Sequence, residues 1–175
     1  MKFFLIIFVK FTFMSVPVFG SDELPVVNSK LPPCNNNQTE YRDNCFGTYI
    51  YADNTKWRGD KYIGEFRDGR FNGQGKWIYG PHSPYAGSYY IGGFKDDELH
   101  GHGVFIEVNG NKYVGEFKND LYNGKGTQTW SNGDKYIGQW KDDLQHGQGT
   151  YIWSDGRKYS GEWYNDKQNG EGKFF

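Results

Sequence analysis

The sequence repeats itself with a period of 23 residues over much of its length. A tyrosine followed two positions later by glycine opens each unit, and the spacings from Tyr113 to Tyr136 and from Tyr136 to Tyr159 are 136 − 113 = 23 and 159 − 136 = 23 residues. A fixed period of this size indicates a repeat architecture, in which each unit contacts only its neighbours. The period therefore restricts the chain to an array of small equivalent units.

The array is expected to cover residues 45–175. It opens on a half unit near Cys45, and the later units start at Tyr62, Tyr90, Tyr113, Tyr136 and Tyr159. The step from Tyr62 to Tyr90 is longer, 90 − 62 = 28 residues, and the extra length falls around residues 80–84, where two prolines and a glycine indicate a longer loop. A similar extension over residues 52–59 precedes Tyr62.

Each unit contains two short stretches with a period of two. In the fourth full unit, Tyr136, Gly138 and Trp140 share one face, and the returning stretch alternates in the same way. Dipeptides that tolerate positive φ angles lie between units, which predicts tight turns there. These dipeptides are Asn109-Gly110, Asn132-Gly133 and Asp155-Gly156. The prediction is an all-β fold: an elongated, open-ended, single-layer antiparallel sheet of consecutive β-hairpins.

Glycine and aromatic residues explain how one layer can be stable. The chain has 25 Gly, 14 Tyr, 14 Phe and 6 Trp, but its mean hydropathy is only −0.84. Glycines leave the sheet surface bare, so rings such as Trp140 and Trp163 are expected to lie on the backbone of neighbouring strands. The structural positions of the repeat are Tyr62, Gly64, Phe66, Gly73, Gly75, Tyr90, Gly92, Phe94, Gly101, Gly103, Tyr113, Gly115, Phe117, Gly124, Gly126, Tyr136, Gly138, Trp140, Gly147, Gly149, Tyr159, Gly161 and Trp163.

The repeated motif resembles that of the MORN (membrane occupation and recognition nexus) family. It reads Tyr-x-Gly-Glu-Trp, a gap, His-Gly-x-Gly and then Asp-Gly-x-Lys, and residues 62–66, 113–117 and 159–163 carry it most fully. Gly93 departs from it by replacing the glutamate, and Glu107 departs by replacing an aromatic residue. The resemblance implies a scaffold that binds proteins, dimerises or attaches to membranes.

The first 44 residues precede the array. Residues 1–20 combine Lys2 with an apolar run and predict a signal peptide, and hence a secreted or periplasmic protein; a retained N-terminal anchor is the alternative. Residues 21–44 predict an irregular linker or cap. Cys34 and Cys45 are the only cysteines and predict a disulfide in an exported chain, whereas two free thiols or half of a metal site are the alternatives.

Residue types that often carry chemistry recur here at turns. His100 and His146 occupy a position that other units fill with asparagine, so a positive φ angle is expected there rather than a ligand. A metal at His100 and His102 lacks an evident third ligand. The carboxylate pairs at residues 96–97 and 142–143 are expected to form a solvated edge. We therefore predict no catalytic, cofactor or metal site, and the formal charge of −1 gives no field that attracts nucleic acid.

Two features could bind a partner. The first is an aromatic face at Trp130, Trp140, Trp153 and Trp163, which could instead only pack internally. The second is a basic row at Lys112, Lys135 and Lys158, which could instead be an ordinary solvated edge.

The leading hypothesis is a non-catalytic scaffold for an unidentified protein partner, with homodimerisation through a sheet edge as a further expectation. The alternative is peripheral binding to membrane lipid or envelope glycan. Specificity is expected where the repeat is broken: at residues 34–45, in the loop 80–88 and at the C-terminal edge.

Overall fold

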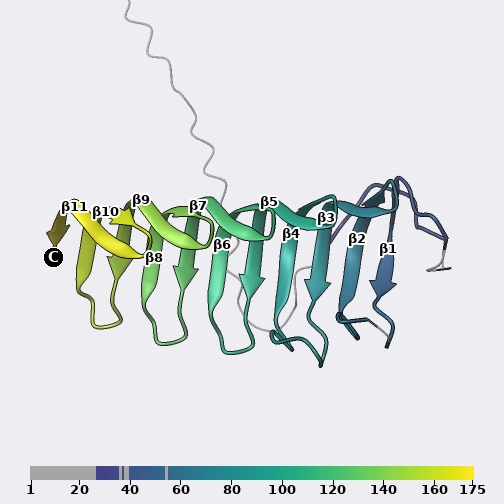
Figure 1. The fold of residues 1–175 in the computed structure, drawn as a ribbon, viewed down its shortest axis with the longest axis horizontal. Helices are drawn as coiled ribbons and strands as arrows, with labels where there is room; N and C mark the ends of the chain where they lie inside the picture. The colour runs from purple at the N-terminus through teal and green to yellow at the C-terminus, as the bar shows by residue number, and fades with distance from the viewer. Residues whose placement is uncertain (1–26, 36, 38–39, 54) are drawn as a thin grey trace, which may run out of the picture.

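The computed structural model describes residues 27–35, 37, 40–53 and 55–175, which contain strands and no helix. The predicted signal peptide, residues 1–20, lies outside the described residues. Eleven strands pair in sequence order, all antiparallel, and lie side by side across the long axis of the molecule (Figure 1). The strands are β1 (Cys45–Ile50), β2 (Lys61–Arg67), β3 (Arg70–Ile78), β4 (Tyr89–Lys95), β5 (Glu98–Ile106), β6 (Lys112–Lys118), β7 (Leu121–Thr129), β8 (Lys135–Lys141), β9 (Leu144–Ile152), β10 (Lys158–Tyr164) and β11 (Lys167–Phe174). The predicted single-layer antiparallel sheet of hairpins is confirmed.

One row of glycines crosses the whole sheet. Each strand contributes one glycine to this row, and each pairs with the glycine of the next strand. The row consists of Gly47, Gly64, Gly75, Gly92, Gly103, Gly115, Gly126, Gly138, Gly149, Gly161 and Gly172. A Cβ atom on Gly126 would lie 2.3 Å from the Tyr113 hydroxyl oxygen, so no larger residue fits there without rearrangement. We call the face on which these tyrosine rings lie the inner face, and the opposite one the outer face.

Tyrosines, and not tryptophans, cover the glycine row. Tyr62, Tyr90, Tyr113 and Tyr136 are fully buried, and each hydroxyl donates a hydrogen bond to the backbone carbonyl three residues later. The distance from the Tyr113 hydroxyl to the Glu116 carbonyl oxygen is 3.0 Å. The expectation that Trp140 and Trp163 lie on the glycines is met only in part, because the Trp163 indole N–H donates to the Gly149 carbonyl at 3.2 Å, whereas the rings directly over the row are tyrosines. The two tryptophans instead meet neighbouring tyrosines edge to face, as in the Tyr136–Trp163 pair with centroids 5.2 Å apart.

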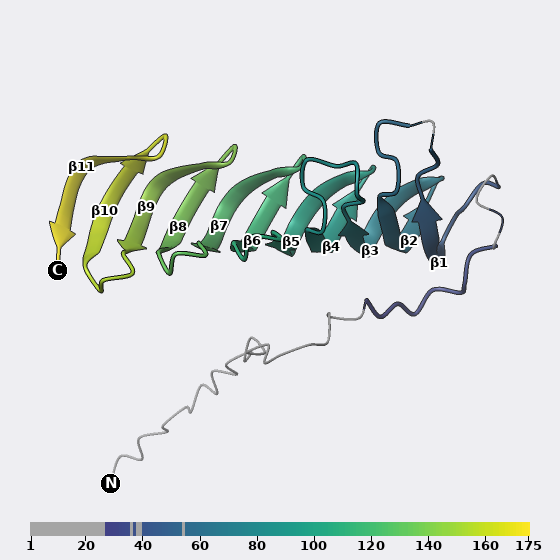
Figure 2. The same cartoon turned by 90° about the horizontal axis from the view of Figure 1, so that it is seen from below.

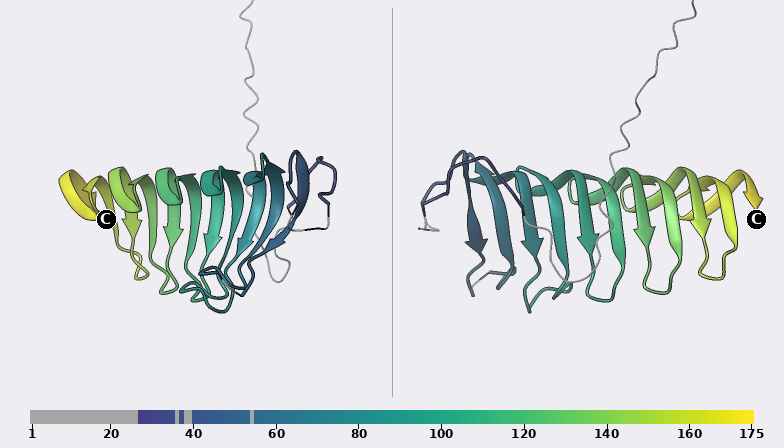
Figure 3. Two further views of the ribbon diagram at one scale, coloured as in Figure 1. Left: turned by 45° about the vertical axis from the view of Figure 1, so that its right-hand side comes forward. Right: turned by 180° about the vertical axis from the view of Figure 1, so that it is seen from behind.

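A bulge bends each returning strand. In the fourth full unit Gly138 pairs with Gly149 but Gln139 pairs with His146, so β9 has two extra residues, Gly147 and Gln148. Bulges increase the local bend of a strand, and the odd-numbered strands from β3 onward curve strongly near their starts in Figures 2 and 3. The sheet is consequently a curved trough whose concave side is the inner face.

The bulge corrects the interpretation of the histidines. Positive φ occurs at Gly101 (73°) and Gly147 (58°), one residue after His100 and His146, and the two histidines are not among the residues with positive φ. The glutamate or glutamine of the motif stabilises the bulge: Gln139 Oε1 accepts a hydrogen bond from the Gln148 backbone N–H at 3.0 Å. Glu65 and Glu116 do the same for their units.

The two-residue turns lie within units and not between them. Both residues of the turn between β4 and β5 have positive φ, 51° at Asp96 and 72° at Asp97, as tight hairpin turns of type I′ require. Between units, the dipeptide Asn109-Gly110 lies in the five-residue loop 107–111, where only Gly110 has positive φ, at 93°. The predicted turns at these dipeptides are present, since the Gly110 N–H donates to the Glu107 carbonyl at 2.9 Å, but they are not two-residue hairpin turns.

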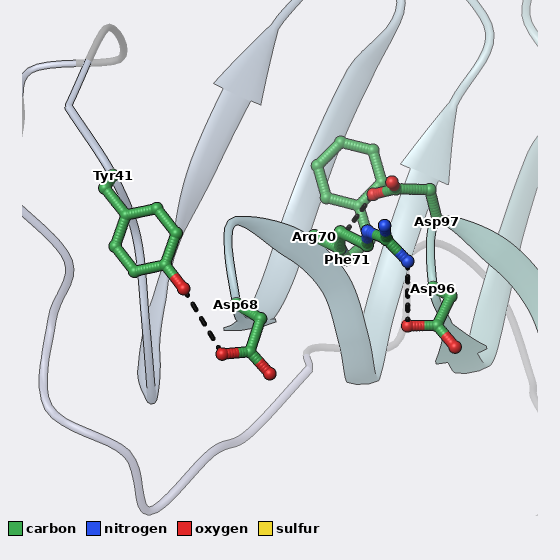
Figure 4. Close-up of polar contacts among 6 residues, drawn as sticks. All are labelled: Tyr41, Asp68, Arg70, Phe71, Asp96 and Asp97. Carbon is green, nitrogen blue, oxygen red and sulfur yellow. Dashed lines mark hydrogen bonds and ion pairs between the residues drawn. The ribbon is translucent and has the colours of Figure 1, made fainter.

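The second residue of each tight turn joins neighbouring units. Asp97 Oδ1 accepts a hydrogen bond from the Phe71 backbone N–H at 2.7 Å, and the Asp97 backbone N–H donates to the Phe71 carbonyl at 3.0 Å (Figure 4). The same pair of bonds joins Asp120 to Leu99, Asp143 to Tyr122 and Asp166 to Gln145. These aspartates therefore have a structural role that the expectation of a merely solvated edge missed.

The segment before β1 is attached to it covalently. Cys34 and Cys45 form a disulfide, as predicted, with sulfur atoms 2.02 Å apart. The Cys34 backbone N–H donates to the Phe46 carbonyl, and the Phe46 N–H donates to the Pro32 carbonyl, both at 2.8 Å. The described part of the irregular segment therefore adds one short parallel bridge to the edge of the sheet, between Pro33 and Phe46.

Reducing this disulfide is expected to loosen the N-terminal edge and leave the rest of the array folded. The crosslink is worth about 3 kcal/mol to the segment that it closes, because the loop is short. Hydrogen exchange at the Phe46 amide should accelerate on reduction, while exchange at Val114 in β6 should not change. Two alkylatable thiols in the non-reduced protein would contradict the pairing, and a Cys34→Ser/Cys45→Ser variant is the control for side effects of the reductant.

Candidate functional site

A groove of about 680 Å³ lies on the inner face, between the loop that follows β1 and the turn that precedes β9. Its floor is built by side chains that the motif turns inward, among them Phe94, Phe117 and Tyr122. Phe94 and Phe117 are buried, while Tyr122 is half-buried and stacks on Tyr113 with ring centroids 3.7 Å apart. The floor is therefore a fixed aromatic surface and not a mobile one.

Two long loops build one wall of the groove. Residues 51–60 connect β1 to β2 and residues 79–88 connect β3 to β4, with the same backbone bonds: Gly59 N–H donates to Tyr51 O at 3.0 Å, and Gly87 N–H donates to Tyr79 O at 3.1 Å. They carry Trp57 and Tyr85, whose exposed fractions of 41% and 53% are high for such large rings. This loop wall therefore presents aromatic surface that the fold does not bury.

A buried carboxylate holds the loop wall in place. Asp60 is fully buried at the end of the first long loop. Its Oδ1 atom accepts a hydrogen bond from the Gly80 backbone N–H at 2.8 Å, and its Oδ2 atom accepts one from the Trp77 indole at 3.2 Å. The two loops are thereby bonded to each other, so Trp57, Trp77 and Tyr85 have a defined arrangement.

Aspartates of the tight turns build the opposite wall. Asp97, Asp120 and Asp143 line the groove and are exposed, and each uses Oδ1 to accept the backbone N–H of the preceding unit. No hydrogen bond or ion pair between described residues involves their Oδ2 atoms. Each of the three carboxylates therefore presents one oxygen that the fold does not use.

The electrostatic character of the groove is negative. The charged residues among its lining are the three aspartates and Glu107, and the lining contains no lysine or arginine. Burial, then the charges of Glu107 and Asp143, raise the pKa of the Tyr122 hydroxyl. Burial also raises the pKa of Asp143 above its usual range, because the charged form loses solvation there. A cation in the groove would therefore meet a favourable potential.

A second, flatter depression of about 740 Å³ lies on the outer face. Its floor is the bare backbone of the glycine row, and one side is formed by branched residues such as Ile91, Val104 and Val114. It lacks exposed rings and a set of converging charges. The inner groove is the stronger candidate for a binding site.

Comparison with protein families agrees with the fold. The model of the MORN repeat matches residues 62–83, 90–112, 113–135, 136–156 and 159–175, more than half of the chain. The chain belongs to the MORN repeat family. A search of curated proteins finds no match. MORN repeat proteins are generally non-catalytic scaffolds, so the groove is best considered as a binding surface.

The MORN repeats place the two predicted binding features on opposite faces. Trp140 and Trp163 are on the inner face but only 6% exposed each, so they belong to the core and not to a binding surface. Trp130 and Trp153 are half-buried and flank Tyr151. All four lie toward the C-terminal end of the array, and none of them lines the groove.

The predicted basic row lies on the outer face. Lys112, Lys135 and Lys158 fall in one register row, in which Thr129 and Ile152 separate them. Each lysine directly precedes an inward-facing tyrosine of the motif, so alternation points it outward. The basic row and the aromatic rings therefore cannot form one site.

The histidines do not form a metal site in the part of the chain that the structure describes, where no group of three potential metal ligands occurs. His146 packs against Tyr164, with ring centroids 5.2 Å apart, and His102 lies at the outer depression. Sequence reasoning interpreted the wall aspartates as a solvated edge, and it did not name Trp57, Trp77 or Tyr85 as candidate site residues. The signal that could have found them is the pair of ten-residue loops 51–60 and 79–88, which interrupt the repeat.

Proposed function

We propose that this protein is a non-catalytic MORN repeat scaffold that holds a partner protein in the groove on its inner face. The observation that supports this most is the exposure of Trp57 and Tyr85 on a wall fixed by Asp60. Rigid aromatic side chains beside a concave surface are the usual anchors of protein interfaces, because they bury much apolar area at little entropic cost. The wall aspartates serve the backbone of neighbouring units, which supports a role in shape and charge and not in acid–base chemistry.

The proposed setting is outside the reducing cytosol. The Cys34–Cys45 disulfide supports this, because structural disulfides persist in oxidising compartments. Among the described residues no helix is long and apolar enough to cross a membrane. Secretion or a periplasmic location, directed by residues 1–20, is part of the proposal.

The test is retention of a partner from an extract of the native compartment. Immobilised wild-type protein should retain a defined protein that a Trp57→Ala/Tyr85→Ala variant fails to retain. An Ile137→Ala variant, altered at an exposed position of the outer face, is the matched control and should retain it fully. Retention that survives the groove substitutions, or is lost on Ile137→Ala, would contradict a role for the groove. Circular dichroism of each variant would verify that the sheet is intact.

A second candidate function is peripheral binding to an anionic membrane through the basic row. The register that places Lys112, Lys135 and Lys158 in one line on the outer face favours it. A basic residue close to an anionic bilayer contributes about 1 kcal/mol. The protein should sediment with anionic vesicles at low salt, and this binding should be lost at high salt and in a triple Lys→Glu variant. Absence of sedimentation at low salt would exclude this function. Dimerisation through the edge strand β11 stays a prediction.

A further inference from the structure

The wall aspartates follow the period of the array. Asp97, Asp120 and Asp143 end the tight turns of three successive units, and each unit advances the sheet by two strands. With about 4.8 Å between strands, neighbouring aspartates are roughly 9.6 Å apart along the groove. The free Oδ2 atoms therefore form a line of negative groups at a regular spacing.

None of the ion pairs between described residues involves an aspartate of this line. Lys95, Lys118 and Lys141 precede the same turns, but each follows an inward aromatic residue of its strand and so projects to the outer face. Arg70 pairs with Asp96, the first residue of its turn, at 3.4 Å, and not with Asp97 (Figure 4). A cationic partner could therefore pair with the carboxylate oxygens that have no partner among the described residues.

The spacing discriminates among peptide conformations. A polyproline II helix rises about 3.1 Å per residue with three residues per turn, so every third side chain points the same way at about 9.3 Å. An extended strand points side chains the same way at about 6.8 or 13.6 Å, and a helix does so every seven residues at about 10.5 Å. Polyproline II is the closest match to roughly 9.6 Å.

The loop wall suits the same conformation. Polyproline II segments dock on grooves lined by aromatic rings and keep their backbone carbonyls free to accept hydrogen bonds. Trp57, Tyr79 and Tyr85 line the groove, and no hydrogen bond between described residues uses the indole N–H of Trp57 or the hydroxyls of the two tyrosines. They are therefore free to donate to such carbonyls.

We propose that the groove takes an extended polyproline II segment of the partner protein, with a lysine or arginine at every third position facing Asp97, Asp120 and Asp143. This inference rests on the proposed function and specifies the chemistry of the partner. Proline rings occupy the aromatic wall, and the basic side chains reach the free carboxylate oxygens. Exposed ion pairs are each worth little, so the affinity depends on the three acting together.

The test uses synthetic peptides and the whole protein, with binding followed by the tryptophan fluorescence of the groove. A peptide of repeated Lys-Pro-Pro should bind, its isomer with the lysines clustered at one end should bind several-fold more weakly, and Glu-Pro-Pro should not bind. Changing the three wall aspartates to asparagine should weaken Lys-Pro-Pro binding by about tenfold and flatten its salt dependence. Asparagine keeps an Oδ1 acceptor for the backbone bond, so thermal unfolding should be unchanged.

Asp166→Asn is the matched control, because Asp166 makes the same bond to Gln145 but does not line the groove. Its binding should equal that of the wild type. Three results would overturn the inference. The two lysine isomers could bind with equal affinity, or spermine could bind as tightly as the Lys-Pro-Pro peptide. A neutral oligosaccharide could also bind tightly, with an affinity that the asparagine substitutions do not change. If no peptide binds while the Trp57→Ala/Tyr85→Ala variant still loses its partner from the extract, only the partner chemistry fails and the proposed function stands.

Discussion

Gly126→Ala is expected to lower the free energy of unfolding by about 3 kcal/mol, enough to melt a marginal array. The added Cβ would lie 2.3 Å from the hydroxyl oxygen of Tyr113 and 2.5 Å from its Cζ atom. The ring cannot give way easily, because it is fully buried, stacks on Tyr122 and donates to the Glu116 carbonyl at 3.0 Å. Urea unfolding followed by circular dichroism measures the loss.

Gly101→Ala is the matched control for this prediction. Unlike Gly126, Gly101 has a positive φ, 73°, but a Cβ there would meet nothing within 4 Å, because Gly93 has no side chain to cover the bulge. Its replacement should cost only the backbone penalty of about 1 kcal/mol. Equal losses at Gly101 and Gly126 would show that the close approach of tyrosine to glycine is not what stabilises the array.

The sheet was predictable because its determinants are local and repeated. Alternation in residues such as Tyr136, Gly138 and Trp140 sets the face of each side chain, and the 23-residue period sets how the units stack. Alternation does not say which ring bends back over the glycine. That is decided by a hydrogen bond, from the tyrosine hydroxyl to a carbonyl three residues on, which tryptophan at position 140 cannot reproduce.

The positions of the tight turns could not be predicted from the sequence either. Asn-Gly is the strongest short hairpin signal, yet here Asn109-Gly110 and its equivalents lie in five-residue loops, and pairs such as Asp142-Asp143 form the tight turns. An aspartate at the second turn position is favoured because it also accepts a backbone N–H from the neighbouring unit, at 2.7 Å for Asp143 and Tyr122. Such a bond between units is invisible in the pattern of one unit.

The sequence indicated one of the loops that border the groove but not the chemistry of the groove. Breaks in the repeat indicated where specificity should lie, and the loop 79–88 does wall the groove. The sequence could not show that residues 51–60 form a matching loop joined to it through Asp60. Nor could it show that the aspartates keep one oxygen free, since that depends on the geometry of three separate turns.

The array is expected to unfold at alkaline pH as its tyrosines ionise together. Burial raises the pKa of Tyr51, Tyr136 and Tyr151 to about 12, and raises those of Tyr62, Tyr113 and Tyr122 as well. An unfolded tyrosine has a pKa near 10, so the folded state holds these protons more tightly. Their contribution to stability is complete below about pH 10 and is lost as the pH rises through about 12.

Ultraviolet absorbance of tyrosinate, followed together with circular dichroism, measures this transition and is insensitive to lysine titration. Most tyrosine ionisation should occur in one steep step that coincides with loss of the β signal, since Tyr113 and its equivalents cannot ionise while their hydroxyls are buried and donate to carbonyls. In denaturant the same tyrosines should titrate gradually near pH 10, which provides the reference. If the buried tyrosines ionise gradually near that pH while the sheet stays intact, the rings over the glycine row are open to solvent. The close packing of Tyr113 on Gly126 would then not form the core of the array.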